Sequence, residues 1–566
     1  MLFILISWMY VVFTTVNFGV VCNKILGLKN KNLVITSFLG LFTITILASI
    51  WAFFGRINFE FHSVLLLCNG FLFFKNKAEI SESYKSWWGN MVTLSPGLKF
   101  FLTFTTLLIL AQCSLLPYVI DNESYYIQTI KWFNEYGFVK GLANLHLYLG
   151  QASGWHVTQS VFNFSFLYAD FNDLSGYCLF LGMLFSVEKV EKYTENMNLN
   201  YLLVGVFPLA SIYFFQFISA PSPDIPIYVL TFVILFYFLE NFKNCSSEKF
   251  NLIVILVLFV LYIKSTSLVL ASLPLLLLIQ NLKVLSKKLI VPGAVALLIL
   301  VLFISKNMII SGSVLFPSKL FASFTTDYSI PKIIESNYYD NIKYFGYQVT
   351  PKQFRAMTIV EMLQHWVSMP KINGIFNKIS ILILLISPLF IYKFQNKKAM
   401  WMLYALMLFQ LILLLATSPQ YRFFMNFMLF FGLFCLICIV QNKKWIHSLL
   451  VIGLLPIVFL LFTPISLRAF TNNKFMLENN IFSVKMLLEP QPNTKMNTDF
   501  EVIELGNLKY HSPLENEFFF GTGNGNLPCV NKTQVEYYRK NFDVIPQMRT
   551  KELKDGFYSK KTATDD

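Results

Sequence analysis

The amino-acid sequence predicts an all-α polytopic membrane protein with about fourteen transmembrane helices and a small extracytoplasmic C-terminal domain, either α+β or rich in β-strands. Of the 566 residues, 55% are hydrophobic and 13% are charged, a balance too apolar for a water-soluble fold. Membrane-length apolar runs recur from Leu2 to Ile465. We therefore expect a membrane domain over residues 1–465 and a soluble domain over residues 466–566.

The apolar runs define the expected spans, because a helix needs about 20 mainly apolar residues to cross ~30 Å of hydrocarbon. Five of these runs, 60–74, 173–187, 225–240, 250–263 and 265–281, are short for such a crossing. We expect spans at about 2–22, 33–55, 60–74, 98–120, 173–187, 200–219, 225–240, 250–263, 265–281, 289–305, 377–394, 399–416, 423–440 and 445–463.

The lysines assign the loops to the two sides of the membrane, because cytoplasmic loops are enriched in Lys and Arg. Lys24, Lys29 and Lys31 follow the first apolar run and no basic stretch precedes it, so we expect a retained first helix with its N-terminus outside. Every second loop is then lysine-rich. This alternation places the long segments 121–172 and 306–376, and the C-terminal domain, outside the plasma (inner) membrane.

The formal net charge of +14 does not indicate a nucleic-acid partner, because the basic residues lie in short loops and form no aromatic-interleaved stripe. The eight cysteines lie mostly in apolar runs and have neither zinc-site nor disulfide spacing. In the C-terminal region, "FEVIELGNLKYHS" alternates as a strand does, and "GTGNGN" is typical of a turn.

Two acids begin the first long outer segment, in "DNESYYIQTIKWFNEYG". Asp121 is the first charge after an apolar run, and Glu123 follows two residues later. One interpretation is a cap for a helix that ends at Gly137. The other is a general base, because a carboxylate at the boundary of the hydrocarbon is partly desolvated and gains basicity. We name Asp121 and Glu123 as candidate catalytic residues.

Other polar residues of the outer loops are candidates for substrate binding. Each also has an ordinary structural interpretation: a helix cap, a snorkelling lysine or a loop turn. Arg422 opens an apolar helix on the outer side, and its guanidinium suits a phosphate or carboxylate. His146 and His156 lack the spacing of a metal pair. The candidates are Asp224, which is also a candidate metal ligand, and Lys264, Lys306, Asn307, Arg422 and His146.

Several of these stretches together resemble a known superfamily. "DNESYYIQTIKWFNEYGFVKGLANLHLYLG", "ISAPSPDIP", "KNMIISGSVLFPS" and "SPQYRF" resemble the GT-C superfamily of membrane glycosyltransferases, and more closely an uncharacterised bacterial family of GT-C-like membrane proteins. The resemblance extends from about Leu98 to Arg422. It implies inverting transfer from a polyprenyl-phosphate-linked sugar donor, with Asp121 as base and Arg422 or Lys264 at the phosphate.

The sequence departs from this family at Tyr126 and Tyr148, where the relatives carry His and Arg, and Cys529 has no cysteine partner in the C-terminal region. The implied partners are the lipid donor, the bilayer and a glycan or lipid acceptor. The one candidate cofactor is a divalent cation, Mg²⁺ or Mn²⁺. A lipid-linked polysaccharide polymerase or ligase, and a transporter or flippase, remain alternatives.

Overall fold

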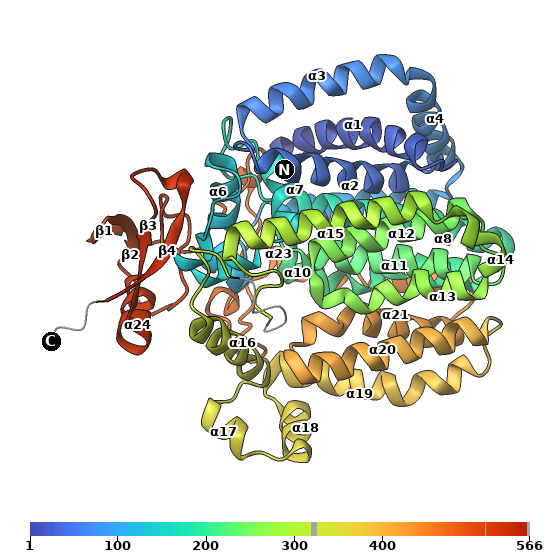
Figure 1. Cartoon of the computed structure of the whole chain (residues 1–566). Helices are drawn as coiled ribbons and strands as arrows, with labels where there is room; N and C mark the ends of the chain where they lie inside the picture. The colour runs from blue at the N-terminus through green and yellow to red at the C-terminus, as the bar shows by residue number, and fades with distance from the viewer. Residues whose placement is uncertain (319–324, 516, 563–566) are drawn as a thin grey trace.

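A computed structural model of the chain describes residues 1–318, 325–515 and 517–562, and it is mostly helical (Figure 1). Within this part, ten helices are long and apolar enough to cross a membrane. They are Leu2–Ile25 (α1), Leu33–Ala52 (α2), Pro96–Cys113 (α5), Leu199–Ile218 (α9, η4 and α10 together), Asp224–Asn241 (α11), Ile290–Ser311 (α15), Lys371–Ile391 (α19), Lys397–Thr417 (α20), Tyr421–Ile439 (α21) and Lys443–Phe462 (α22 and α23 together).

The expected count of about fourteen spans is not confirmed: the described residues contain ten such helices, or eleven if one bent pair forms a single span, and four of the short runs account for the difference. Helices α3 (Phe59–Lys75) and α12 (Ser247–Ile263) each have 17 residues. Helix α8 (Leu174–Asn196) carries Glu188, Lys189 and Glu191 in its C-terminal half. The run at 265–281 divides into η5 (Ser265–Ala271) and α13 (Ser272–Gln280), and then bends by 94° into α14 (Leu282–Leu285) and η6 (Ser286–Lys288).

The loops fall into two groups at opposite ends of the bundle, as the lysine pattern predicts. At one end Lys24 pairs with Glu79 at 2.5 Å, and Lys31 pairs with Glu82 of α4 (Lys77–Thr93) at 2.6 Å. At the other end the amino group of Met1 donates to the carbonyl of Met486 at 2.5 Å. Figure 1 shows α4 and α14 at one end and α6, α16 and the strands at the other. Which end faces outward stays a prediction.

The long segments between the spans form short helices at the strand-bearing end. The first contains η1 (Asn122–Tyr126), α6 (Ile127–Glu135), η2 (Leu142–Asn144), η3 (Leu147–Gln151) and α7 (Gly154–Phe162). Gly137 ends α6 as predicted, with φ +75°, and a Cβ there would lie 2.5 Å from two carbonyl oxygens. The second contains α16 (Lys332–Tyr347), α17 (Pro351–Ala356) and α18 (Ile359–Ser368), and its residues 319–324 lie outside the described residues.

The C-terminal region contains two antiparallel strand pairs. Strands β1 (Phe500–Leu505) and β2 (Leu508–Pro513) are the predicted alternating stretch, with Phe500 opposite Pro513. Strands β3 (Val544–Met548) and β4 (Phe557–Lys561) form the second pair, and the sequence did not predict them or α24 (Lys532–Phe542). The short turns η7 (Lys474–Met476), η8 (Val484–Leu487) and η9 (Leu553–Asp555) complete the described region.

This region packs on segment 121–172, which we call the first outer segment after its predicted side, instead of standing apart. The amide of Phe557 donates to the carbonyl of Lys140 at 2.9 Å. Both Gln128 and Lys131 of α6 donate to the carbonyl of Gly525 at 2.8 Å. The "GTGNGN" turn is therefore a docking point for α6.

We expect the two ends of the bundle to lie on opposite sides of the membrane. In intact cells, a membrane-impermeant maleimide should label Lys352→Cys in α17 and should leave Lys287→Cys in η6 unlabelled until the cells are permeabilised. Both positions are exposed. The variants need a Cys68→Ser background, because Cys68 is an exposed native thiol. Equal labelling of both positions in intact cells would contradict the topology.

Candidate functional site

An ion pair joins two residues that lie 301 positions apart in the sequence. Nη1 of Arg422 donates to Oδ2 of Asp121 at 2.6 Å. The hydroxyl of Tyr126 donates to the same oxygen at 3.4 Å. No residue in the described part of the chain donates a hydrogen bond to Oδ1 of Asp121. One oxygen of this carboxylate is therefore held, and the other can accept a hydrogen bond from a ligand.

A second carboxylate, that of Asp224, also lies against Arg422. Its Oδ2 is 3.8 Å from Nη1 of Arg422, and its Oδ1 accepts a hydrogen bond from Nζ of Lys264. Asp224 begins α11, Lys264 directly follows α12, and Arg422 is the second residue of α21. We call Asp121, Asp224, Lys264 and Arg422 the ionic cluster. Their predicted convergence in one place is confirmed, whereas their roles stay predictions.

The helix-cap interpretation of Asp121 and Asp224 is wrong. Neither side chain accepts a capping hydrogen bond from the first turn of the helix it begins. Ser222 takes that place at α11, where its hydroxyl accepts from the amide of Asp224 at 3.3 Å. The carboxylates of Asp121 and Asp224 are instead directed to cations.

The ionic cluster is electrically balanced and is reachable from one side. It contains two carboxylates and two cations, and such pairing is what makes the burial of charged groups tolerable. The side chain of Asp224 is only 3% exposed, whereas those of Asp121, Lys264 and Arg422 are 14%, 17% and 18% exposed. A ligand would therefore approach past these three side chains.

A row of tyrosine rings leads away from Asp121. The rings of Tyr126 and Tyr125 lie 4.8 Å apart, Tyr125 and Tyr148 5.4 Å, and Tyr148 and Tyr338 5.5 Å. Burial, followed by the neighbouring Tyr125 and Asp121, raises the pKa of Tyr126, so its hydroxyl stays protonated and donates. Sequence reasoning did not find this row, because Tyr148 and Tyr338 come from different outer segments.

Glu123 does not join the ionic cluster, which corrects the expectation that it acts beside Asp121. Its carboxylate accepts from the hydroxyl of Thr494 at 2.5 Å, and from the amides of Lys495 at 2.8 Å and Met496 at 3.4 Å. It is fully buried, and burial raises its pKa. Glu123 therefore attaches the C-terminal region to the first outer segment.

His146 likewise has a structural place outside the ionic cluster. Its Nε2 lies 3.2 Å from the carbonyl of Phe520, and its Nδ1 accepts from the amide of Tyr148 at 3.2 Å. Burial lowers its pKa to about 4, so the ring is neutral at physiological pH. The predicted substrate contact of His146 has no support in this arrangement.

Lys306 and Asn307 lie near the end of α15. Asn307 donates to the carbonyl of Val314 at 3.2 Å and so holds the turn that contains Gly312, as the loop interpretation predicts. Lys306 donates to the carbonyl of Ala152, just before α7. Lys306 therefore contacts the first outer segment, whereas Asn307 only stabilises the turn after α15.

The acids of the ionic cluster do not form a set of metal ligands. The described residues contain no group of three or more His, Cys, Asp and Glu side chains that could hold a metal ion. Asp121 and Asp224 each contact a cation already. Mg²⁺ and Mn²⁺ prefer carboxylate and other oxygen ligands, which cationic neighbours oppose. These residues therefore do not fit a divalent cation.

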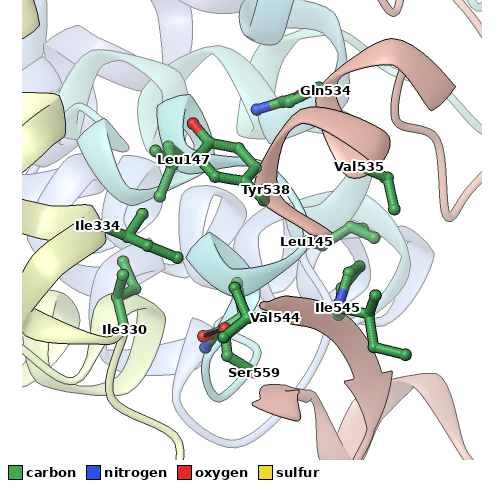
Figure 2. A pocket seen from close by; sticks show the side chains of 12 residues that line it. Leu145, Leu147, Ile330, Ile334, Gln534, Val535, Tyr538, Val544, Ile545 and Ser559 are labelled. Atoms are coloured by element: carbon green, nitrogen blue, oxygen red, sulfur yellow. Dashed lines mark hydrogen bonds between the residues drawn. The ribbon is translucent and has the colours of Figure 1, made fainter. Parts of the chain in front are cut away.

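A separate hollow lies where the first outer segment, α16 and the C-terminal region meet. Figure 2 shows it between α24 and Leu147, with Ile334 on the facing element. None of its lining residues is charged, and Ser559 donates to Asn144 across one edge at 2.7 Å. This hollow offers apolar contact but no acid or cation, so the ionic cluster is the better candidate site.

Removal of Arg422 alone should destabilise the protein more than removal of both Arg422 and Asp121. We expect Arg422→Gln to lower the free energy of unfolding by about 3 kcal/mol, because it leaves two poorly exposed carboxylates without their shared cation. Adding Asp121→Asn should restore part of this loss, as measured by thermal unfolding in detergent.

The pair between Arg549 and Asp327 is a matched control, with the same N–O distance of 2.6 Å but a side chain of Asp327 that is 71% exposed. Asp327→Asn should cost less than about 1 kcal/mol. A double variant no more stable than Arg422→Gln would contradict the proposed balance of charges.

The attachment through Glu123 should depend on pH. Because its folded-state pKa is raised above 4.5, its contribution to stability is fully present below that pH and is lost as the pH rises through the folded-state value. The stability of wild type relative to Glu123→Gln should therefore increase as the pH falls towards 4.5. Thermal unfolding over a pH series measures this, with the exposed Glu504→Gln as control. A difference that is constant with pH would contradict the burial argument.

Comparison with known proteins places the chain in a family. The family model that matches is described as a domain of unknown function, DUF8201, and it matches residues 1–429. The matched region includes all four residues of the ionic cluster, as well as Lys306, and it ends before the C-terminal region. No curated protein and no solved structure matches the chain significantly. The chain therefore belongs to the DUF8201 family.

Proposed function

We propose that the protein is a membrane glycosyltransferase of the GT-C type. It transfers a sugar from a polyprenyl-phosphate-linked donor to a glycan or lipid acceptor on the outer side of the membrane. The observation that supports this most is the ionic cluster, a partly exposed group of acids and cations at the loop end of an apolar helical bundle. A lipid-linked phosphate and a water-soluble acceptor meet at that level of the membrane.

Asp121 is the proposed general base. In the transfer, the acceptor oxygen forms a bond to the anomeric carbon and gives its proton to Asp121. The bond from the anomeric carbon to the phosphate oxygen breaks, and its electron pair leaves with the phosphate. Oδ1 of Asp121 suits this role, because Arg422 and Tyr126 hold Oδ2 and leave Oδ1 to accept from the acceptor hydroxyl.

The cations have a different role in this proposal. Negative charge increases on the phosphate as the sugar leaves, so positive groups placed beforehand stabilise the transition state more than the ground state. Arg422 orients Asp121 through one Nη group and faces Asp224. Lys264 is held by Asp224 and remains 17% exposed, so an entering phosphate can reach its ammonium group.

The test compares the surface glycans of cells that carry wild type, a deletion and Asp121→Asn. We expect Asp121→Asn to reduce the transfer rate by about 10²–10⁴, which is the usual contribution of a general base, and so to reproduce the glycan profile of the deletion. Mass spectrometry of released glycans and glycolipids measures the outcome. Immunoblots establish that each variant reaches the membrane in equal amount.

Asp327→Asn is the matched control, because it breaks an Arg–Asp pair of the same N–O distance away from the ionic cluster. It should leave the glycans unchanged. A wild-type glycan profile in cells with normal amounts of Asp121→Asn protein would refute the proposed role of Asp121.

A further inference from the structure

Lys306 is a buried lysine without a carboxylate partner. It is 2% exposed, and no acidic side chain of the described chain forms an ion pair with it. Its ammonium group donates to the carbonyl of Ala152 and lies 5.7 Å from the ring centre of Tyr262. A carbonyl and a ring face compensate a buried charge only in part. Lys306 therefore retains N–H donors that an anion can use, and a bound anion would favour its charged form.

His156 adds an unpartnered donor in the same region. The amide of Ser153 donates to Nδ1 of His156 at 3.4 Å, so in the neutral ring the hydrogen is on Nε2. This Nε2 is buried and makes no hydrogen bond within the described chain. Burial, and after it the positive charges of Lys306 and Lys264, lower the pKa of His156 to about 3. The ring is therefore neutral at physiological pH and offers one N–H.

The start of α7 brings these groups to the ionic cluster. Ala152 accepts from Lys306, and the hydroxyl of Ser153 donates to the carbonyl of Ile263, the residue before Lys264, at 2.6 Å. At Gly154 a Cβ would lie 2.5 Å from the ring of Tyr262, so this turn packs directly on the end of α12. Lys264 and Lys306 thus both border the first turn of α7, whose positive end also favours an anion.

The balance of charge indicates what the region binds. The two carboxylates of the ionic cluster already neutralise Arg422 and Lys264. Lys306 is a third basic side chain, and no acid of the described chain pairs with it. We infer that Lys306 and the Nε2–H of His156 form an oxyanion subsite beside the ionic cluster, and that this subsite takes the phosphate ester group of a lipid-linked ligand.

This inference rests on the proposed function for the identity of the ligand, and it changes one expectation. The sequence favoured Arg422 or Lys264 as the phosphate contact, but both are already paired with carboxylates. Lys264 is the more exposed lysine and Lys306 the more buried one, so the phosphate enters past Lys264 and ends at Lys306 and His156. Arg422 then stays with Asp121 and Asp224 as an orienting residue.

The experiment measures binding of farnesyl phosphate to the full chain purified in detergent, by isothermal titration calorimetry. Inorganic phosphate and farnesol are titrated separately. We expect Lys306→Met and His156→Phe each to weaken binding of farnesyl phosphate about tenfold or more, because each removes a buried donor to a charged group. Lys306→Arg keeps the charge, and His156→Gln keeps both an acceptor for Ser153 and an N–H, so both should bind within a few-fold of wild type.

Lys189→Met is the matched control, because Lys189 is also buried and lies over aromatic rings but belongs to α8 at the lysine-rich end. It should bind as wild type does. Gel filtration and thermal unfolding verify that each variant is folded. If a methionine or phenylalanine variant fails to fold, the affinities of His156→Gln and His156→Asn for farnesyl phosphate are compared instead. Asparagine is too short to reach both the amide of Ser153 and the phosphate, so His156→Asn should bind more weakly than His156→Gln, and equal affinities would overturn the inference.

The outcomes separate the two ligand sources and the two proposals. Binding of farnesyl phosphate that depends on Lys306 and His156 and is much tighter than that of inorganic phosphate supports the subsite and a lipid-linked ligand. Equally tight binding of inorganic phosphate with the same dependence supports the subsite and identifies free phosphate as the ligand. Equal affinity of wild type, Lys306→Met and His156→Phe overturns it, as does equal binding of farnesol. Asp121→Asn should still bind farnesyl phosphate, so loss of the proposed function in the glycan test leaves this result unaffected.

Discussion

The contact of Arg422 with two carboxylates is the constraint on which the arrangement of the strand-bearing end of the bundle depends. It ties the segment after α5 to the start of α21, and through Asp224 and Lys264 it also ties the starts or ends of α11 and α12. Charges this poorly exposed are stable only as pairs, because each alone would lack hydration. Four segments distant in the sequence must therefore meet at one point, and the helices that carry them must end at one level.

The first outer segment is fixed from two sides around that point. Glu123 and Gln128 bind the C-terminal region, whereas Asn134 of α6 donates to the carbonyls of Ile57 and Ser160. The π-helical turn η1 lies between these contacts, and the side chains of Asp121 and Glu123 at its start bind different partners. One acid meets Arg422, and the other holds the neighbouring domain, although only one residue separates them.

Basic side chains are distributed unevenly around the site, and in the proposed function this distribution decides where the phosphate binds. The ionic cluster is neutral as a set, so it can orient Asp121 without strongly attracting anions. Lys306 and His156 lie deeper. No acid of the described chain pairs with Lys306, and Nε2 of His156 makes no hydrogen bond there. A phosphate would therefore be drawn past the ionic cluster towards Lys306, while a neutral hydroxyl could remain near Oδ1 of Asp121. Under the proposed function, the sugar donor and the acceptor therefore have separate places.

The sequence by itself determined the membrane class, the grouping of loops, helix α6 with its stop at Gly137, and the hairpin of β1 and β2, because these follow from local composition and periodicity. It also selected Asp121, Asp224, Lys264 and Arg422 by charge type and loop position. Only the tertiary structure showed that Glu123 and His146 have structural contacts, and that four of the expected spans form short, bent or charge-bearing helices. It also showed that His156 has an unused donor. The physical reason is that hydrogen-bond partners and burial depend on residues far away in the sequence.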